Sequence, residues 1–117
     1  MKFSREIMKG ATPYIIMQVL HQLKEAYGYQ IMKTIREESE DIFDFPDSTL
    51  YPILYRLEQK GLITSDIKEL EGKKTRRYYW LTEKGLDYLG VQEKEMKHYL
   101  KGLGKFIPGH TFGGSFA

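Results

Sequence analysis

The chain of 117 residues contains no cysteine, which excludes a disulfide framework, a thiolate nucleophile and cysteine-bound zinc. Although 41% of its residues are hydrophobic, no run approaches the roughly 20 apolar residues that a membrane-spanning helix needs. The first residues, Met1–Glu6, carry charge, but no apolar stretch follows them as it would in a secretory signal. We therefore expect a cytoplasmic protein with no membrane partner.

The sequence also lacks the residue spacings on which enzymes and metal sites depend. Its histidines, His21, His98 and His110, lie far apart and form no H-x-x-x-H or H-E-x-x-H pair. No glycine-rich phosphate loop follows a predicted strand. Asp44 and Asp47 lie in an acidic loop, where solvation and helix capping explain them better than catalysis does. We expect no enzyme activity, no cofactor and no metal.

The charge is distributed unevenly. The net charge of +2 is too small to indicate a nucleic-acid partner by itself. However, residues 36–47 hold six acidic residues against one basic residue, whereas Gly72–Arg77 contains no acidic residue. The basic residues of that second segment are Lys73, Lys74, Arg76 and Arg77. One short segment therefore concentrates positive charge.

The spacing of apolar residues predicts two helices before residue 41. Thr12 and Pro13 are typical of a helix start, and apolar residues then recur at helical spacing as far as Glu25. The segment before it, residues 2–9, is expected to be either a short arm or an extra helix. A second helix is expected over Tyr29–Glu40.

A third helix follows a loop that ends in proline. Since proline is tolerated in a first turn, Pro52 places the helix start near Thr49, with Asp47 or Ser48 as the cap. Gly61 is expected to terminate the helix. The predicted buried face consists of Leu50, Ile53, Leu54 and Leu57. The residues left outside are Thr49, Tyr51, Tyr55, Arg56 and Lys60.

The second half of the chain predicts a β-hairpin and a long helix. Leu62–Ile67 and Arg77–Leu81 are rich in β-branched and aromatic residues, and Glu71–Lys73 between them has turn composition. We expect Tyr78, Tyr79 and Trp80 to pack and fix the hairpin more than to stack on bases. Thr82 is expected to cap a helix over residues 83–107, followed by a flexible tail at 108–117.

The last helix is expected to pair with a second copy of the chain. A helix of roughly 20 residues extends about 30 Å, farther than one small domain covers, although packing on the chain's own core is the alternative. The residues expected at this dimer interface are Leu86, Leu89, Met96, Tyr99, Leu100 and Leu103.

Helices followed by a β-hairpin are the order of elements in a winged helix-turn-helix. In that motif the second helix of the helix-turn-helix pair enters the major groove of DNA. The expected fold class is mainly α with a two-stranded β-hairpin, with a DNA-binding domain over residues 1–82 and a dimerisation helix over 83–107. Arg56 and Tyr51 are the leading candidates to contact bases or phosphates, and Lys73 and Lys74 to anchor phosphates. The full set of expected DNA contacts is Ser48, Thr49, Tyr51, Arg56, Lys60, Lys73, Lys74 and Arg76.

The stretch Tyr27–Leu89 resembles the PadR-type transcriptional regulators. The motifs that carry the resemblance are Tyr27-Gly28-Tyr29 with Ile31, Leu50-Tyr51-Pro52 with Leu54, Arg56-Leu57-Glu58, Gly61-Leu62-Ile63, and Arg77-Tyr78-Tyr79 with Leu81-Thr82 and Gly85. The resemblance implies a winged-helix domain, a homodimer joined through a C-terminal helix, and usually repression of a neighbouring gene. A chain that ends at Ala117 resembles the short members, which have one helix there.

Some short members bind flat aromatic drugs at the dimer interface through a tryptophan on the last helix. Here the single tryptophan, Trp80, falls on the second strand of the predicted hairpin instead. Whether the protein binds a small aromatic effector is therefore left open by the sequence. The sequence favours a homodimeric repressor of double-stranded DNA with a roughly palindromic operator. The alternatives are a protein-interaction adaptor, which could use the acidic stretch 36–47, and a multidrug-binding repressor with a ligand pore at the dimer interface.

Overall fold

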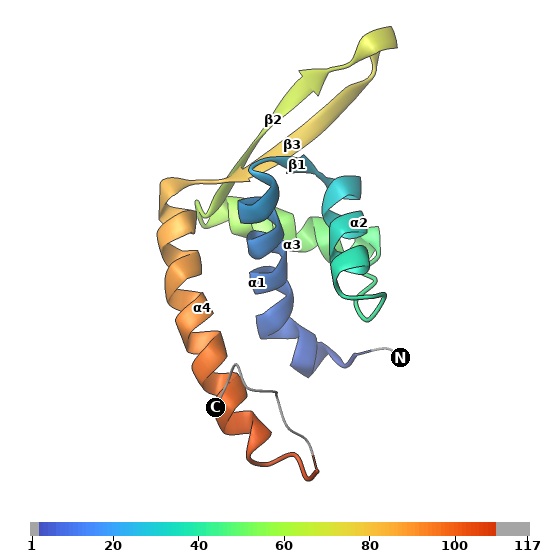
Figure 1. Cartoon of the computed structure of the whole chain (residues 1–117). Coiled ribbons are helices and arrows are strands. Elements are labelled where there is room, and N and C mark those ends of the chain that lie inside the picture. Colours follow the sequence, from blue (N-terminus) through green and yellow to red (C-terminus); the bar gives the residue numbers. More distant parts are fainter. Residues whose placement is uncertain (1–2, 110–117) are drawn as a thin grey trace.

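The computed structural model describes residues 3–109, in which three helices support a small sheet and a fourth helix runs down one side (Figure 1). A long hairpin of two strands projects from the top of this body. Of the tail predicted over residues 108–117, residues 110–117 lie outside the described residues. The elements are α1 (Arg5–Leu23), β1 (Ala26–Tyr27), α2 (Gly28–Glu38), α3 (Asp47–Gln59), β2 (Ile63–Glu69), the short helix η1 (Glu71–Lys73), β3 (Thr75–Leu81) and α4 (Glu83–Gly104).

The predicted start of α1 at Thr12 is wrong. The helix begins at Arg5, and Ser4 caps it by accepting a hydrogen bond from the backbone N–H of Ile7 at 3.4 Å. Pro13 lies inside the helix, although it removes one backbone donor. The helix nevertheless continues through it, and the side chains that it buries begin at Thr12, with only Met8 of the earlier turns packed partly against the core. The buried residues are Thr12, Ile16, Met17, Val19 and Leu20.

The predicted cap of α3 is also wrong. Pro46 is the N-cap, no side chain caps the helix, and Asp47 is its first residue. The Pro46 carbonyl accepts the backbone N–H groups of Thr49 at 2.9 Å and of Leu50 at 3.0 Å. Pro52 consequently lies inside the helix. A backbone carbonyl held by the preceding loop thus sets the start of this helix.

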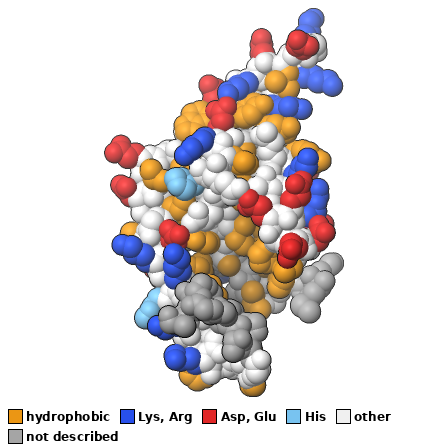
Figure 2. All heavy atoms as spheres, in the orientation of Figure 1, with side chains coloured by type: hydrophobic (Ala, Val, Ile, Leu, Met, Phe, Trp, Pro, Cys, Tyr) orange, Lys and Arg blue, Asp and Glu red, His pale blue; other side chains and the backbone are white. Residues whose placement is uncertain are grey.

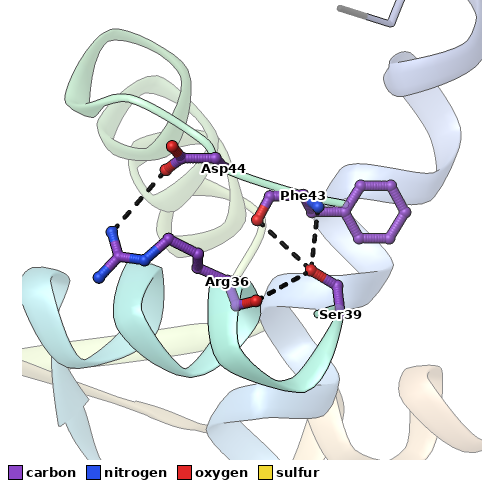
Figure 3. Close-up of polar contacts among 4 residues, drawn as sticks. All are labelled: Arg36, Ser39, Phe43 and Asp44. Carbon is purple, nitrogen blue, oxygen red and sulfur yellow. Dashed lines mark hydrogen bonds and ion pairs between the residues drawn. The ribbon is translucent and has the colours of Figure 1, made fainter. Parts of the chain in front are cut away.

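Figure 3 shows how that loop, between α2 and α3, is held. The Ser39 hydroxyl accepts the backbone N–H of Phe43 at 2.9 Å, and its oxygen also lies 3.3 Å from the Arg36 carbonyl oxygen. The guanidinium of Arg36 pairs with the Asp44 carboxylate at 3.9 Å. The Phe45 ring stacks on that of Phe43 and is buried in the core. These contacts tie the loop to the end of α2 and to the core.

The end of α3 confirms the prediction for Gly61. Its φ angle is +74°, a conformation that glycine adopts at little cost. The Gly61 N–H donates to the Glu58 carbonyl at 3.0 Å, and the Leu62 N–H donates to the Leu57 carbonyl at 3.0 Å. These two hydrogen bonds form the Schellman motif, which terminates the helix and leads directly into β2.

The sheet has three antiparallel strands in the order β1-β3-β2, one more than predicted. Strands β2 and β3 pair from Ile63 opposite Leu81 at the base to Glu69 opposite Thr75 near the tip. We call this hairpin, residues 63–81, the wing. The extra strand β1 has only two residues, too few to show an alternating pattern in the sequence, and it pairs with Tyr78 and Tyr79 in the middle of β3.

One hydrophobic core joins the helices to the base of the wing. The predicted buried face of α3 is confirmed, since Leu50, Ile53, Leu54 and Leu57 are all buried. The predicted packing of the wing aromatics is confirmed most clearly for Tyr79, which is also buried. Within residues 3–109, no helix is long and apolar enough to cross a membrane.

Candidate nucleic-acid interface

Helix α3 presents its polar side to solvent. Its exposed residues are Asp47, Ser48, Tyr51, Pro52, Tyr55, Arg56 and Gln59, and Lys60, the C-cap that follows it, is exposed too. Thr49 is half-buried. Tyr55 and Gln59 lie one turn apart, opposite the buried face. The sequence prediction left both out of the DNA contacts, although helical periodicity alone would have shown that they lie at the centre of the exposed side.

Tyr51 connects α3 to the start of α2. Its side chain is 44% exposed, and its ring end lies over Gly28, the first residue of α2. A Cβ atom at Gly28 would lie 2.8 Å from the Tyr51 Cζ atom and would overlap the hydroxyl. Part of the Tyr51 ring therefore serves the packing of the two helices, while the rest remains accessible.

A polar bridge links α3 to the wing. The Ser65 hydroxyl on β2 lies 3.0 and 3.1 Å from the two Glu58 carboxylate oxygens, and it accepts a bond from the Arg77 guanidinium at 3.0 Å. Glu58 belongs to α3 and Arg77 to β3. Because α3, β2 and β3 each contribute one group to this bridge, it ties the wing to α3.

The basic residues predicted on the wing are all exposed, but they lie in different places. Lys73 and Lys74 lie at the tip, where η1 ends. The Arg76 guanidinium instead lies over the Tyr27 ring, 4.2 Å from its centroid. In Figure 2 the wing carries lysine and arginine side chains mixed with acidic ones. The tip lysines are thus the freest positive charges of the wing for an external anion.

A second cation lies over the ring of Tyr78, the neighbour of Tyr27. The Lys68 ammonium lies 4.5 Å from the centroid of the Tyr78 ring and pairs with the Glu25 carboxylate. That hydrogen bond to Glu25 raises the pKa of Lys68 above its ordinary value. Tyr78 itself packs edge-on against Tyr27. Since Glu25 already balances its charge, Lys68 contributes less than the tip lysines to the field of the wing.

Helix α4 begins as predicted and leaves most of its apolar residues accessible. Thr82 caps it, accepting the backbone N–H of Gly85 at 3.0 Å. Leu86, Tyr99 and Leu103 are exposed by 46%, 68% and 41%. Met96 and Leu100 are half-buried. Leu89 differs from the prediction, because it is buried in the chain's own core instead of facing outward.

Within the described part of the chain, no group of three or more histidine, aspartate or glutamate side chains is placed to hold a metal ion. The site is instead an exposed polar helix face on the body of the domain and a basic tip on the wing, both open to solvent.

Residues 16–91 match the model of the Transcriptional regulator PadR-like family, which is more than half of the chain. The chain belongs to this family. The structure of a transcriptional regulator from Clostridium thermocellum is 31% identical, with a TM-score of 0.79 over 87% of this chain and 98% of that chain. A PadR-like transcription factor from Bacteroides fragilis is 30% identical, with a TM-score of 0.73 over 87% and 95% of the two chains.

An uncharacterized protein of Lysinibacillus sphaericus is also similar to this PadR-like regulator, at 29% identity over 89% of this chain and 94% of its own length. In each of these comparisons the similarity covers well over two thirds of both chains. The resemblance found on short sequence motifs is therefore confirmed, and so is the winged-helix fold class.

Proposed function

We propose that this PadR-like regulator is a homodimeric, sequence-specific DNA-binding protein that represses transcription at a roughly palindromic operator. The observation that carries the proposal is the exposed polar face of α3, joined by the Glu58–Ser65–Arg77 bridge to a wing with a basic tip. The major groove of B-DNA is about 12 Å wide and admits one α-helix. Helix α3 would occupy it, with the wing on the adjacent backbone.

The proposed contacts divide by chemistry. Hydroxyls and guanidinium groups on α3 suit base edges and phosphates, since arginine binds guanine through two hydrogen bonds. Tyr51 and Arg56 are the leading contacts on this helix, with Ser48, Thr49 and Lys60 beside them. On the wing, Lys73 and Lys74 would neutralise phosphates and release counterions, which supplies affinity without sequence preference. Arg76 would act from further back along β3.

The proposed dimer uses α4. Its exposed Leu86, Tyr99 and Leu103 form an apolar surface that a second copy would bury, together with the half-buried Met96 and Leu100. Residues 1–82 would then be the DNA-binding domain and 83–107 the dimerisation helix. Two α3 helices would enter successive major grooves, about 34 Å apart along the DNA. We infer that the protein acts in the cytoplasm and is not an enzyme.

The role of Arg56 tests the proposal. Because a base contact or a phosphate contact is lost when arginine becomes alanine, Arg56→Ala should weaken binding to DNA from upstream of the protein's own gene, by about 1–3 kcal/mol if it reads a base. Electrophoretic mobility shift with that DNA and with a random duplex measures both effects. Lys94→Ala, which changes an exposed residue of α4, is the control. If Arg56→Ala binds both duplexes as the unaltered protein does, its assignment is wrong.

A ligand-responsive repressor is a second candidate, favoured by an open groove of about 560 Å³ between α1, β3 and the start of α4. Its lining includes Leu20, Trp80 and Leu86, which offer an indole ring and aliphatic walls to a flat aromatic compound. Trp80 borders this groove, so ligand binding should quench its fluorescence. A titration with planar aromatic compounds that neither quenches Trp80 nor releases DNA would count against this candidate.

A further inference from the structure

A second basic surface lies on the side of α3 that faces away from the wing. A groove of about 450 Å³ runs between the first turns of α1 and the exposed side of α3. Three cationic side chains line it, namely Arg5 and Lys9 of α1 and Arg56 of α3. We call it the α1–α3 groove. Arg5 and Lys9 are four residues apart and therefore lie on the same side of α1.

The composition of the groove suits a phosphate. No acidic residue lines it, although Glu6 is adjacent on α1, and the hydroxyls of Ser48 and Thr49 lie among the cations. Within residues 3–109, the side chains of Arg5, Lys9 and Arg56 take part in none of the ion pairs. All three residues are exposed. Three neighbouring positive charges without a carboxylate partner favour an anion, and the hydroxyls can donate to its oxygens.

The basic lining continues along α3. Lys9 also borders a smaller cavity of about 180 Å³, which is lined by Lys60 from the end of α3. Arg5, Lys9, Arg56 and Lys60 therefore form a row of positive charge along one edge of the helix. The opposite edge of α3 carries Glu58, which contacts the wing through Ser65. The two edges of α3 thus differ in what they offer to DNA.

The dimensions of DNA make both edges of α3 relevant. An α-helix with its side chains is about 10–12 Å across, so it fills a major groove of about 12 Å and brings a phosphate backbone to each of its edges. The wing would contact one of these two phosphate backbones. On the other edge, the α1–α3 groove lies where the second backbone would pass.

We infer that the α1–α3 groove binds backbone phosphates of the DNA strand that the wing does not touch, through Arg5, Lys9 and Arg56. This inference rests on the proposed function and adds α1 to the DNA interface. It also changes the role of Arg56 from base reader to phosphate ligand, which leaves the central residues Tyr55 and Gln59 as the side chains best placed to meet base edges. Neither α1 residue was among the contacts predicted from the sequence.

The test is the salt dependence of binding for the double variant Arg5→Gln with Lys9→Gln. Binding is measured by fluorescence anisotropy with a labelled random-sequence duplex of about 30 base pairs, long enough for two half-sites one turn apart. Each lost phosphate contact lowers the slope of log K against log salt by about 0.9. We expect the slope to become shallower by up to about 1.8 for each protomer, or about 3.6 for a dimer. Preference for the upstream DNA over the random duplex should not change.

The matched control is Lys94→Gln with Lys101→Gln, which removes two exposed positive charges of α4. A charge-conserving variant, Arg5→Lys with Lys9→Arg, should keep the slope of the unaltered protein. If the double glutamine variant does not fold by circular dichroism, Lys9→Gln alone should give about half the change in slope.

A slope equal to that of the unaltered protein or of the control, or a loss of preference for the upstream DNA, overturns the inference while leaving DNA binding intact. Failure of the unaltered protein to bind any duplex at low salt overturns the proposed function instead.

Discussion

Replacing Gly85 by alanine should destabilise the whole domain, because this glycine is where α4 crosses the start of β2. A Cβ atom there would overlap the Leu62 carbonyl oxygen and lie 2.8 Å from the carbonyl carbon, whereas real Cβ atoms essentially never come within 3.0 Å of such atoms. The obstacle is backbone, so it cannot move aside as the end of a side chain can. The same Leu62 carbonyl accepts the N–H of Thr82 at 3.1 Å.

The magnitude follows from these two contacts. Overpacking against a well-packed core costs about 1–3 kcal/mol, and a weakened Leu62–Thr82 hydrogen bond adds about 0.5–1.5 kcal/mol. The higher helix propensity of alanine returns at most about 1 kcal/mol. We expect Gly85→Ala to lower the free energy of unfolding by about 2–3 kcal/mol, or to lower Tm by roughly 10 °C.

Urea unfolding followed by circular dichroism measures this change. Gly90→Ala is the matched control, since it lies in the same helix and a Cβ atom there would meet nothing within 4 Å. That control should be unchanged or more stable by up to about 1 kcal/mol. All proteins are compared at one concentration, because a dimer's stability depends on it. If Gly85→Ala is as stable as Gly90→Ala, the close crossing described here is wrong.

Three further predictions concern the contact between α2 and α3, the wing, and the dependence of stability on pH. Gly28→Ala should cost stability that Tyr51→Phe partly restores, because removing the Tyr51 hydroxyl relieves the overlap; a double-mutant cycle in urea that shows no coupling would contradict this. Lys73→Gln with Lys74→Gln should lower the salt slope of DNA binding by about 1.8 per protomer in a mobility shift or anisotropy series, and an unchanged slope would remove the wing from the interface. Burial raises the pKa of Tyr79, so its contribution to stability is present at neutral pH and is lost as the pH rises past its ordinary value of about 10. Between about pH 9 and pH 11, the Tyr79→Phe variant should therefore lose less stability in urea unfolding than the unaltered protein; equal losses would contradict the assignment.

The sequence predicted best those features that short-range rules decide. The buried face of α3, the helix end at Gly61 and the cap at Thr82 each depend on a few neighbouring residues, and each is confirmed. The start of α1 was missed because Pro13 is a strong local signal for a helix start. The helix instead extends back through Pro13 to the cap at Ser4, although its buried residues begin only at Thr12.

The candidate site shows the same division. The exposure of Arg56 follows from helical periodicity, but its neighbours Arg5 and Lys9 lie more than forty residues earlier in the chain and meet it only through the packing of α1 on α3. Leu89 has the spacing of a dimer contact, and only the packing of the first turns of α4 on the core shows that it points inward. Strand β1 has too few residues to carry any pattern.

Direct measurement of DNA binding tests the central claim, that α3 and the wing together form a DNA-binding surface. Fluorescence anisotropy compares a labelled duplex from upstream of the protein's own gene with a random duplex over a series of salt concentrations. The account predicts tighter binding to the upstream duplex, affinity for both that falls steeply with salt, and a shallower fall when Lys73 and Lys74 are replaced. Absence of binding to either duplex at low salt by the folded protein would contradict it.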